Sequence, residues 1–132
     1  MAQADEQART IAVTGAMVQI VSHALLTGSL FLFTGVPFSR GGTHAFNRWG
    51  GLARPAPIFA AALGVAAFGS LGLPGLSAFI AEFQIFTGSL QAAPVPTVIA
   101  VTGIVVTVGL FLLALQRLLT GKTQVPNPAE DR

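Results

Sequence analysis

Two side chains that can carry a proton, Glu82 and His23, lie deep inside long apolar stretches of this sequence. Glu82 is the only Asp, Glu, Lys or Arg between Pro55 and Gln116, and its carboxyl group can take up and release a proton. The imidazole of His23 can donate and accept a hydrogen bond at the same time. Gln19 and Thr27 stand one helical turn before and after His23, so the three share one face of a helix. These residue types, in these surroundings, predict proton transfer.

Each of the two residues also has a simpler interpretation. Glu82 could lie near a helix end, among lipid headgroups, whereas acids inside a membrane are rare and usually face a polar cavity or a partner. A helix break close to Glu82 favours the functional interpretation, because such breaks are typical of ion sites in transporters. His23 could instead hydrogen-bond a neighbouring helix as a packing residue, and the residues leave these two interpretations equally open.

Other chemistry has little support in the sequence. The second histidine, His44, lies beside Arg40 and Arg48 and is interpreted as a solvated loop residue. Two histidines without cysteine do not make a zinc site, and we expect no metal, flavin, quinone or cluster to be bound by this chain. No run of Lys and Arg alternates with aromatic residues, so no nucleic-acid partner is expected.

The composition indicates which elements must position Glu82 and His23. Of the 132 residues, 52% are hydrophobic and 9% are charged, against about 25% charged in ordinary soluble domains. This predicts an all-α transmembrane protein in a lipid bilayer. Three spans are expected, at about 10–38, 56–90 and 97–119, within a membrane domain of residues 10–120. A polar N-terminal tail covers residues 1–9, and a tail over residues 121–132 is predicted to be disordered.

The second predicted span is too long for one straight crossing. Its 35 residues would make a helix of about 52 Å, while the hydrocarbon core is about 30 Å thick. Gly72, Pro74 and Gly75 supply an interruption, because proline removes a backbone donor and glycine unwinds at little steric cost. The span is therefore predicted to be a discontinuous helix, broken at the sequence SLGLPG. Unwound backbone at membrane depth must face protein or a water-filled cavity.

The basic residues predict the orientation in the membrane. The connector of residues 39–54 has three arginines, two more basic residues lie at and just beyond the end of the third span, and the link between the second and third spans has none. The positive-inside rule then places residues 39–54 and the C-terminus in the cytoplasm, and we expect a bacterial inner (plasma) membrane. Trp49, at the edge of the predicted membrane region, suits an interfacial anchor. The five basic residues are Arg40, Arg48, Arg54, Arg117 and Lys122.

Two longer pieces of sequence resemble a known family. They read GAMVQIVSHALLTGSLFLFTG and RWGGLARPAPIFAAALGVAAFGSLGLPGLSAFIAEF, within a resemblance that covers about residues 13–120. They resemble the proton-translocating membrane subunits of respiratory complex I, NADH-quinone oxidoreductase, and subunit M (the chain-4 type) above all. The wider family includes subunits of Mrp-type cation/proton antiporters and of membrane-bound hydrogenases.

The resemblance implies a role for each candidate residue. Glu82 matches the acid that closes the proton path toward the outer side, and His23 matches a relay residue of the preceding helix. Sister subunits often have lysine at the position of Glu82, so glutamate favours the M type. The resemblance also implies other membrane-arm subunits as partners, and NADH and quinone as molecules that the assembly uses. This chain would have no redox chemistry of its own.

The sequence also departs from the family pattern. Family subunits have many more spans than three, and their first repeat, with a lysine and its glutamate partner, has no counterpart here. We therefore expect a C-terminal piece, arising from a split gene, an incomplete gene assignment or a degenerate copy. Two other functions stay open: a subunit of an Mrp-type cation/proton antiporter, and a structural or non-functional fragment.

Overall fold

The computed structural model describes residues 2–126, and side chains from residue 5 onward. Within this part the chain forms four α-helices, one short 3-10 helix and no strand, so the predicted all-α class is confirmed. The only pairing of strand type there is an isolated bridge between Gly50 and Gln124. The elements are α1 (Ala2–Gly41), η1 (Phe46–Arg48), α2 (Pro57–Ser70), α3 (Ser77–Ala92) and α4 (Pro94–Leu119).

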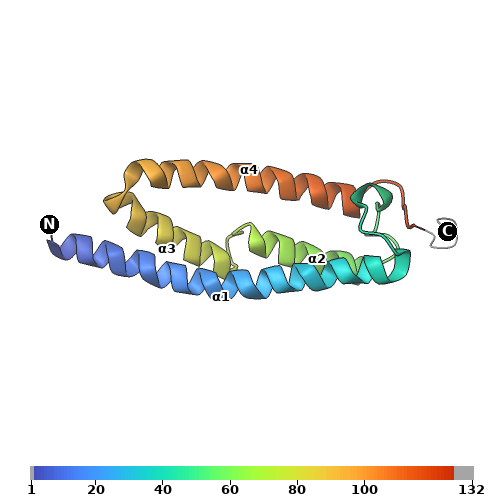
Figure 1. Ribbon diagram of the computed structural model, residues 1–132, viewed down its shortest axis with the longest axis horizontal. Helices are drawn as coiled ribbons and strands as arrows, with labels where there is room; N and C mark the ends of the chain where they lie inside the picture. Colours follow the sequence, from blue (N-terminus) through green and yellow to red (C-terminus); the bar gives the residue numbers. More distant parts are fainter. Residues whose placement is uncertain (1, 127–132) are drawn as a thin grey trace.

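The helices form an elongated bundle in which α1 runs the full length (Figure 1). The shorter helices α2 and α3 follow one another alongside α1, and α4 returns along their other side. The first helix also takes in most of the predicted polar tail, with Asp5 in its first turn. An acid there is favourable because the N-terminal end of a helix is partially positive.

Two helices are long and apolar enough to cross a membrane: residues 5–41 of α1 and 94–119 of α4. Only 6% of the most apolar window of each is buried in the fold, so these helices are not the covered core of a soluble domain. The region predicted as the second span, 56–90, holds α2 with 14 residues and α3 with 16. Each is shorter than the roughly 20 residues of one crossing. Helix length therefore gives two spans where the sequence predicts three.

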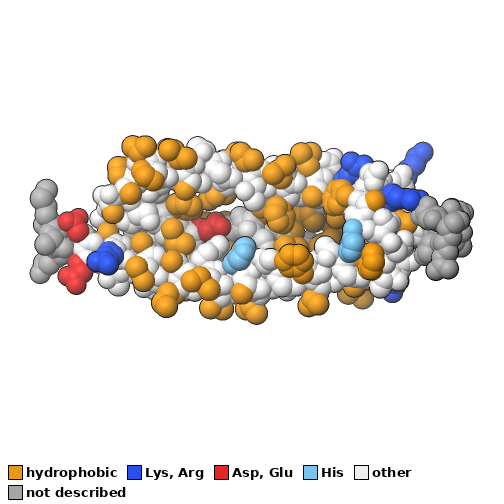
Figure 2. Space-filling model, viewed as in Figure 1, with side chains coloured by type: hydrophobic (Ala, Val, Ile, Leu, Met, Phe, Trp, Pro, Cys, Tyr) orange, Lys and Arg blue, Asp and Glu red, His pale blue; other side chains and the backbone are white. Residues whose placement is uncertain are grey.

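The surface between the two ends of the bundle is apolar. Figure 2 shows basic side chains gathered at the ends and hydrophobic side chains spread between them. Large apolar side chains are widely exposed, among them Phe31 at 72%, Leu32 at 77% and Ile58 at 86%. Such a surface is unsuited to water and suited to lipid, which makes this an integral membrane protein.

Small residues bring α1 and α3 close together. Ala8, Gly15 and Ser22 recur every seven residues on α1, and all three are buried. A Cβ added to Gly15 would lie 2.8 Å from the backbone oxygen of Ala81 on α3. One added to Gly88 of α3 would lie 2.5 Å from the backbone oxygen of Ala8. Backbones this close require small residues, as in helix pairs within membranes.

The connector before α2 closes the end of α4. The backbone N–H groups of Leu52 and Ala53 donate to the carbonyls of Leu118 and Leu119, at 2.9 and 3.2 Å. These carbonyls accept no hydrogen bond from within α4, because the last turn of a helix leaves its carbonyls unpaired. The connector thereby supplies the hydrogen bonds that the end of α4 lacks.

The connector and the tail also contact one another. Trp49, predicted as an interfacial anchor, is only 6% exposed, and its indole N–H donates to the carbonyl of Thr43 at 3.2 Å. Of the tail predicted to be disordered, residues 121–126 run beside the connector, where Gly50 and Gln124 exchange two backbone hydrogen bonds of 3.1 and 2.9 Å. The rest of that prediction, residues 127–132, lies outside the described residues.

Candidate functional site

A tight turn separates α2 from α3 at the place where the sequence has its glycine and proline cluster. Helix α2 ends at Ser70 and α3 begins at Ser77. Gly72 and Gly75 have φ values of +66° and +101°, a region that other residues rarely adopt. Pro74 stands between them, where no helical N–H is required. All three residues predicted to break a helix thus lie in the turn.

The carboxyl group of Glu82 lies against this turn. A Cβ added to Gly72 would overlap Oε2 of Glu82, and it would lie 3.0 Å from Cδ and 3.3 Å from Oε1. Side chains on a helix point back toward its N-terminus, so a residue in the second turn of α3 can reach the segment before it. The carboxyl group therefore lies near the N-terminal end of α3, where the helix dipole favours negative charge.

Two hollows meet at Glu82. A groove of about 610 Å³ lies between α3 and α4 and is mostly apolar, with Glu82, Thr87, Thr97 and Thr102 as its polar members. A smaller hollow of about 240 Å³ on the other side shares Glu82 and adds Ser70 and Thr107. No hydrogen bond or ion pair joins Glu82 to any side chain in residues 5–126, so its carboxyl oxygens are available to water or to an added group.

His23 is not among the residues that line these two hollows. It is exposed on α1, and its ring nitrogens are 3.3 and 3.4 Å from the hydroxyl of Thr27, one turn later. This places two members of the predicted polar stripe in contact. The structure does not join His23 to Glu82 by any hydrogen bond within the described part of the chain. The other histidine, His44, stacks on Phe38 with ring centroids 4.2 Å apart.

Gln84 is a polar residue that the sequence reasoning missed. Its Oε1 atom, like that of Gln19, is buried and has no hydrogen-bond partner among the described residues. The Cβ of Gln84 lies 2.8 Å from the position of a Cβ on Gly15, so Gln84 faces α1 while Glu82 faces α4. Buried amide oxygens normally have a partner, which makes both glutamines candidate contacts for water. The available signal was an amide two residues after Glu82, among the large apolar side chains of α3.

The residues that could ligate a metal are not gathered in one place. Within residues 5–126, no three side chains of His, Cys, Asp or Glu lie close enough together to hold an ion. The chemistry that the arrangement can support is proton exchange between a carboxyl group and water in the adjoining hollows.

A comparison with known families gives this geometry a context. The model of the family described as NADH:quinone oxidoreductase/Mrp antiporter, transmembrane, matches residues 6–108. The chain belongs to this family. The match includes most of α1, both helices beside the turn, Glu82 and much of α4. The predicted resemblance is thereby confirmed.

Individual relatives agree with the family assignment. The chain is 44% identical over 112 residues to F420H2 dehydrogenase subunit M of Methanosarcina mazei, covering 85% of this chain and 23% of that protein. It is 40% identical over 93 residues to NADH-quinone oxidoreductase subunit M of Rickettsia conorii, covering 70% and 19%. It is 34% identical over 122 residues to NAD(P)H-quinone oxidoreductase chain 4 1 of Synechococcus sp., covering 92% and 23%. The chain thus spans less than a quarter of the length of these relatives.

Proposed function

We propose that this chain is a subunit M-like part of the proton-translocating membrane arm of an NADH-quinone oxidoreductase, and that Glu82 carries the proton. The observation that carries the proposal is the position of Glu82: a lone carboxyl group, against the backbone of a glycine turn, between two hollows. The names of the relatives support the assignment to a quinone oxidoreductase. Coupling to electron transport is part of the proposal.

In this proposal α2, the turn and α3 cross the membrane together as one discontinuous span, the third of the chain. Their sequential arrangement beside α1 supports it, as does the apolar character of α2 (Figure 1). The turn then lies inside the membrane, where its backbone groups need protein or water as partners. Residues 39–54 and the C-terminus face the cytoplasm of a bacterial inner membrane, because basic residues gather at that end.

The proton would pass between Glu82 and His23 through confined water. No direct hydrogen bond links these residues, so any transfer needs an intermediate carrier. The buried amide oxygens of Gln19 and Gln84 lie on the two helices that carry them and could hold such water. In this scheme Glu82 alternates between its charged and neutral forms while the close-packed helices α1 and α3 hold its backbone in place.

The remaining parts of a proton pump would come from partners. We propose that other membrane-arm subunits surround the chain in the bilayer, and that NADH and quinone react elsewhere in the assembly. The chain itself would contribute no redox step and bind neither molecule.

The test is the substitution Glu82→Gln, which keeps the shape of the side chain and removes its charge. Membranes that carry the variant are first checked on a native gel for migration of the chain with a large NADH-oxidising complex. Proton pumping is then measured per NADH oxidised. We expect assembly to be retained and the pumping ratio to fall clearly. The matched control is Glu6→Gln, the same change at the exposed start of α1.

Two results would contradict the proposal. An unchanged pumping ratio in assembled Glu82→Gln would remove the proton-carrying role. Migration of the chain alone, together with tolerance of substitution at both Glu82 and His23, would favour a structural or non-functional fragment.

The second candidate function is a subunit of an Mrp-type cation/proton antiporter, which the description of the matching family includes. In that case antiporter subunits would copurify with the chain. Loss of the chain would then lower tolerance of sodium or of alkaline pH, while NADH oxidation would stay unchanged.

A further inference from the structure

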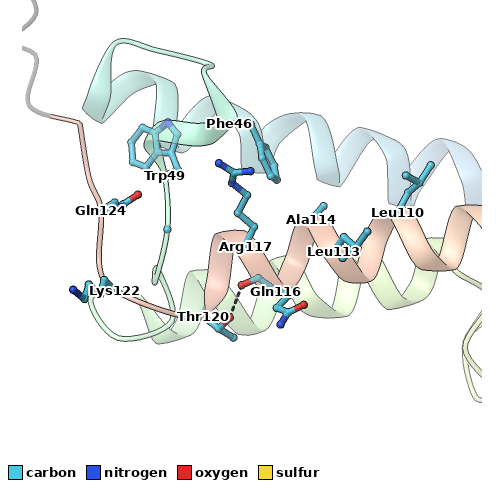
Figure 3. A pocket seen from close by; sticks show the side chains of 11 residues that line it. Phe46, Trp49, Leu110, Leu113, Ala114, Gln116, Arg117, Thr120, Lys122 and Gln124 are labelled. Atoms are coloured by element: carbon cyan, nitrogen blue, oxygen red, sulfur yellow. Dashed lines mark hydrogen bonds between the residues drawn. The ribbon is translucent and has the colours of Figure 1, made fainter.

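A second site lies at the basic end of the bundle, far along the chain from Glu82. A pocket of about 870 Å³ opens between the connector and the last turns of α4. Figure 3 shows Arg117 pointing from α4 toward the connector that carries Phe46 and Trp49, whereas Lys122, which also lines the pocket, lies on the tail with its side chain directed away from Arg117. The pocket therefore combines cationic and aromatic side chains at one end of the molecule.

The positive charge in this pocket is not neutralised by the protein. Arg117 forms no ion pair with any residue in 5–126, and no Asp or Glu lines the pocket. The acids in that part of the chain are Asp5 and Glu6, at the opposite end of α1, and Glu82. An arginine guanidinium presents a planar fork of donors that matches phosphate oxygens. The chemistry that suits this pocket is therefore that of a phosphate-bearing anion.

The wall next to Arg117 is apolar and runs into the bilayer. Leu110, Leu113, Ala114 and Arg117 all line the pocket and follow one another on a single face of α4. From Leu110 to Arg117 the helix rises about 10 Å. Leu113 is 65% exposed and Leu110 is 63% exposed, so the apolar surface is open to a ligand. A cation at the membrane edge followed by leucines at greater depth matches a phospholipid, in which the headgroup phosphate lies at the edge and the acyl chains lie deeper.

We propose that this pocket binds an anionic phospholipid, with its headgroup phosphate at Arg117 and an acyl chain along Leu113 and Leu110. The uncompensated charge of Arg117 favours an anionic headgroup over a zwitterionic one. The apolar wall favours a lipid over free phosphate, which would leave the leucines unused. Trp49 holds the connector in place through its hydrogen bond to Thr43 and contributes an aromatic wall.

The chain carries its own reporter for this pocket, because Trp49 is its only tryptophan. The purified 132-residue chain, in micelles of an uncharged maltoside detergent, is titrated with brominated phosphatidylglycerol or brominated phosphatidylcholine, whose bromine atoms quench tryptophan fluorescence at short range. We expect half-maximal quenching at a mole fraction of phosphatidylglycerol about fivefold lower than that of phosphatidylcholine. This ratio corresponds to the interaction of roughly one basic residue with an anionic headgroup. Inorganic phosphate alone should leave the emission unchanged at millimolar concentrations.

Substitutions can distinguish recognition of the lipid by this pocket from a general attraction of anionic lipid to the positive surface. Arg117→Gln should bring the two lipids to near parity, and Arg117→Lys should keep part of the preference. The matched control is Arg54→Gln, which removes an exposed cation near the same end but outside the pocket lining. It should keep the preference, and circular dichroism should show equal helix content in every variant.

Three outcomes would overturn the proposal. Equal quenching by the two lipids in the unmodified chain would mean that the headgroup charge is not recognised. An equal loss in Arg54→Gln and Arg117→Gln would mean that only diffuse charge matters. A saturable response to inorganic phosphate without preference for phosphatidylglycerol would assign the pocket to a free anion.

Discussion

Helix α3 has two faces that differ in kind. The face toward α1 is closed: Ala81 is fully buried, and Gly88 leaves no room for even a methyl group beside Ala8. The face toward α4 is open and carries Glu82 in a groove of about 610 Å³. Small residues let the backbones on the first face approach closely, and the large side chains on the second keep the helices apart.

The difference shows how a hollow can persist next to a charged side chain inside a bundle. Dispersion contacts between α1 and α3 hold the backbone of α3 from its closed face. The opposite face is then free to hold a carboxyl group and space for water. If this division of roles is right, equivalent changes on the two faces must have very different effects.

The largest effect is expected from Gly88→Ala on the closed face. The new Cβ would lie 2.5 Å from the Ala8 oxygen and 2.7 Å from the Ala12 nitrogen, both of them backbone atoms that cannot turn away. Overpacking of this kind costs about 1–3 kcal/mol. Thermal unfolding in detergent, followed by circular dichroism, should show a clearly lower midpoint. An unchanged midpoint would mean that α1 and α3 are less tightly packed than described.

A smaller effect is expected from Gly72→Ala in the turn. The positive φ of Gly72 costs an alanine about 1–2 kcal/mol, and its methyl group would also displace the Glu82 carboxyl group. The two causes can be separated in a double-mutant cycle with Glu82→Ala. Gly72→Ala should destabilise the chain less when Glu82 has been shortened. Equal destabilisation in both backgrounds would place the carboxyl group away from the turn.

The smallest effect is expected from Gly103→Ala on α4, the same substitution as Gly88→Ala on the open side. Gly103 lines the smaller hollow beside Glu82, and an added Cβ would meet no atom within 4 Å. Alanine is favoured over glycine in a helix by about 1 kcal/mol. The unfolding midpoint should therefore stay the same or rise slightly. A fall comparable to that of Gly88→Ala would remove the distinction between the two faces.

The sequence predicts local features of this molecule well. Gly72, Pro74 and Gly75 lie in the turn between α2 and α3, because their backbone preferences act on their own segment. The isolation of Glu82 among apolar residues also singles out a side chain whose carboxyl group lies against this turn, and its role in proton transfer stays a prediction.

Features that depend on distant contacts could not be predicted. Nothing local indicates that Gly15 packs on Ala81 or that Gln84 turns its amide oxygen into the interior. Trp49 fits the composition of an interfacial anchor, yet the folded connector buries it. The N-terminal residues read as a polar tail but extend α1, because Ala, Gln and Glu are strong helix formers.

The hydrogen bonds between the connector and the end of α4 have a consequence for biosynthesis. The connector emerges before α2, while its partners Leu118 and Leu119 are made some 65 residues later. Until α4 is complete, the donors of Leu52 and Ala53 must stay in contact with water, and they cannot enter the bilayer unpaired. Insertion of α4 is therefore the step that completes the hydrogen bonding of the connector, although the connector is made before α2.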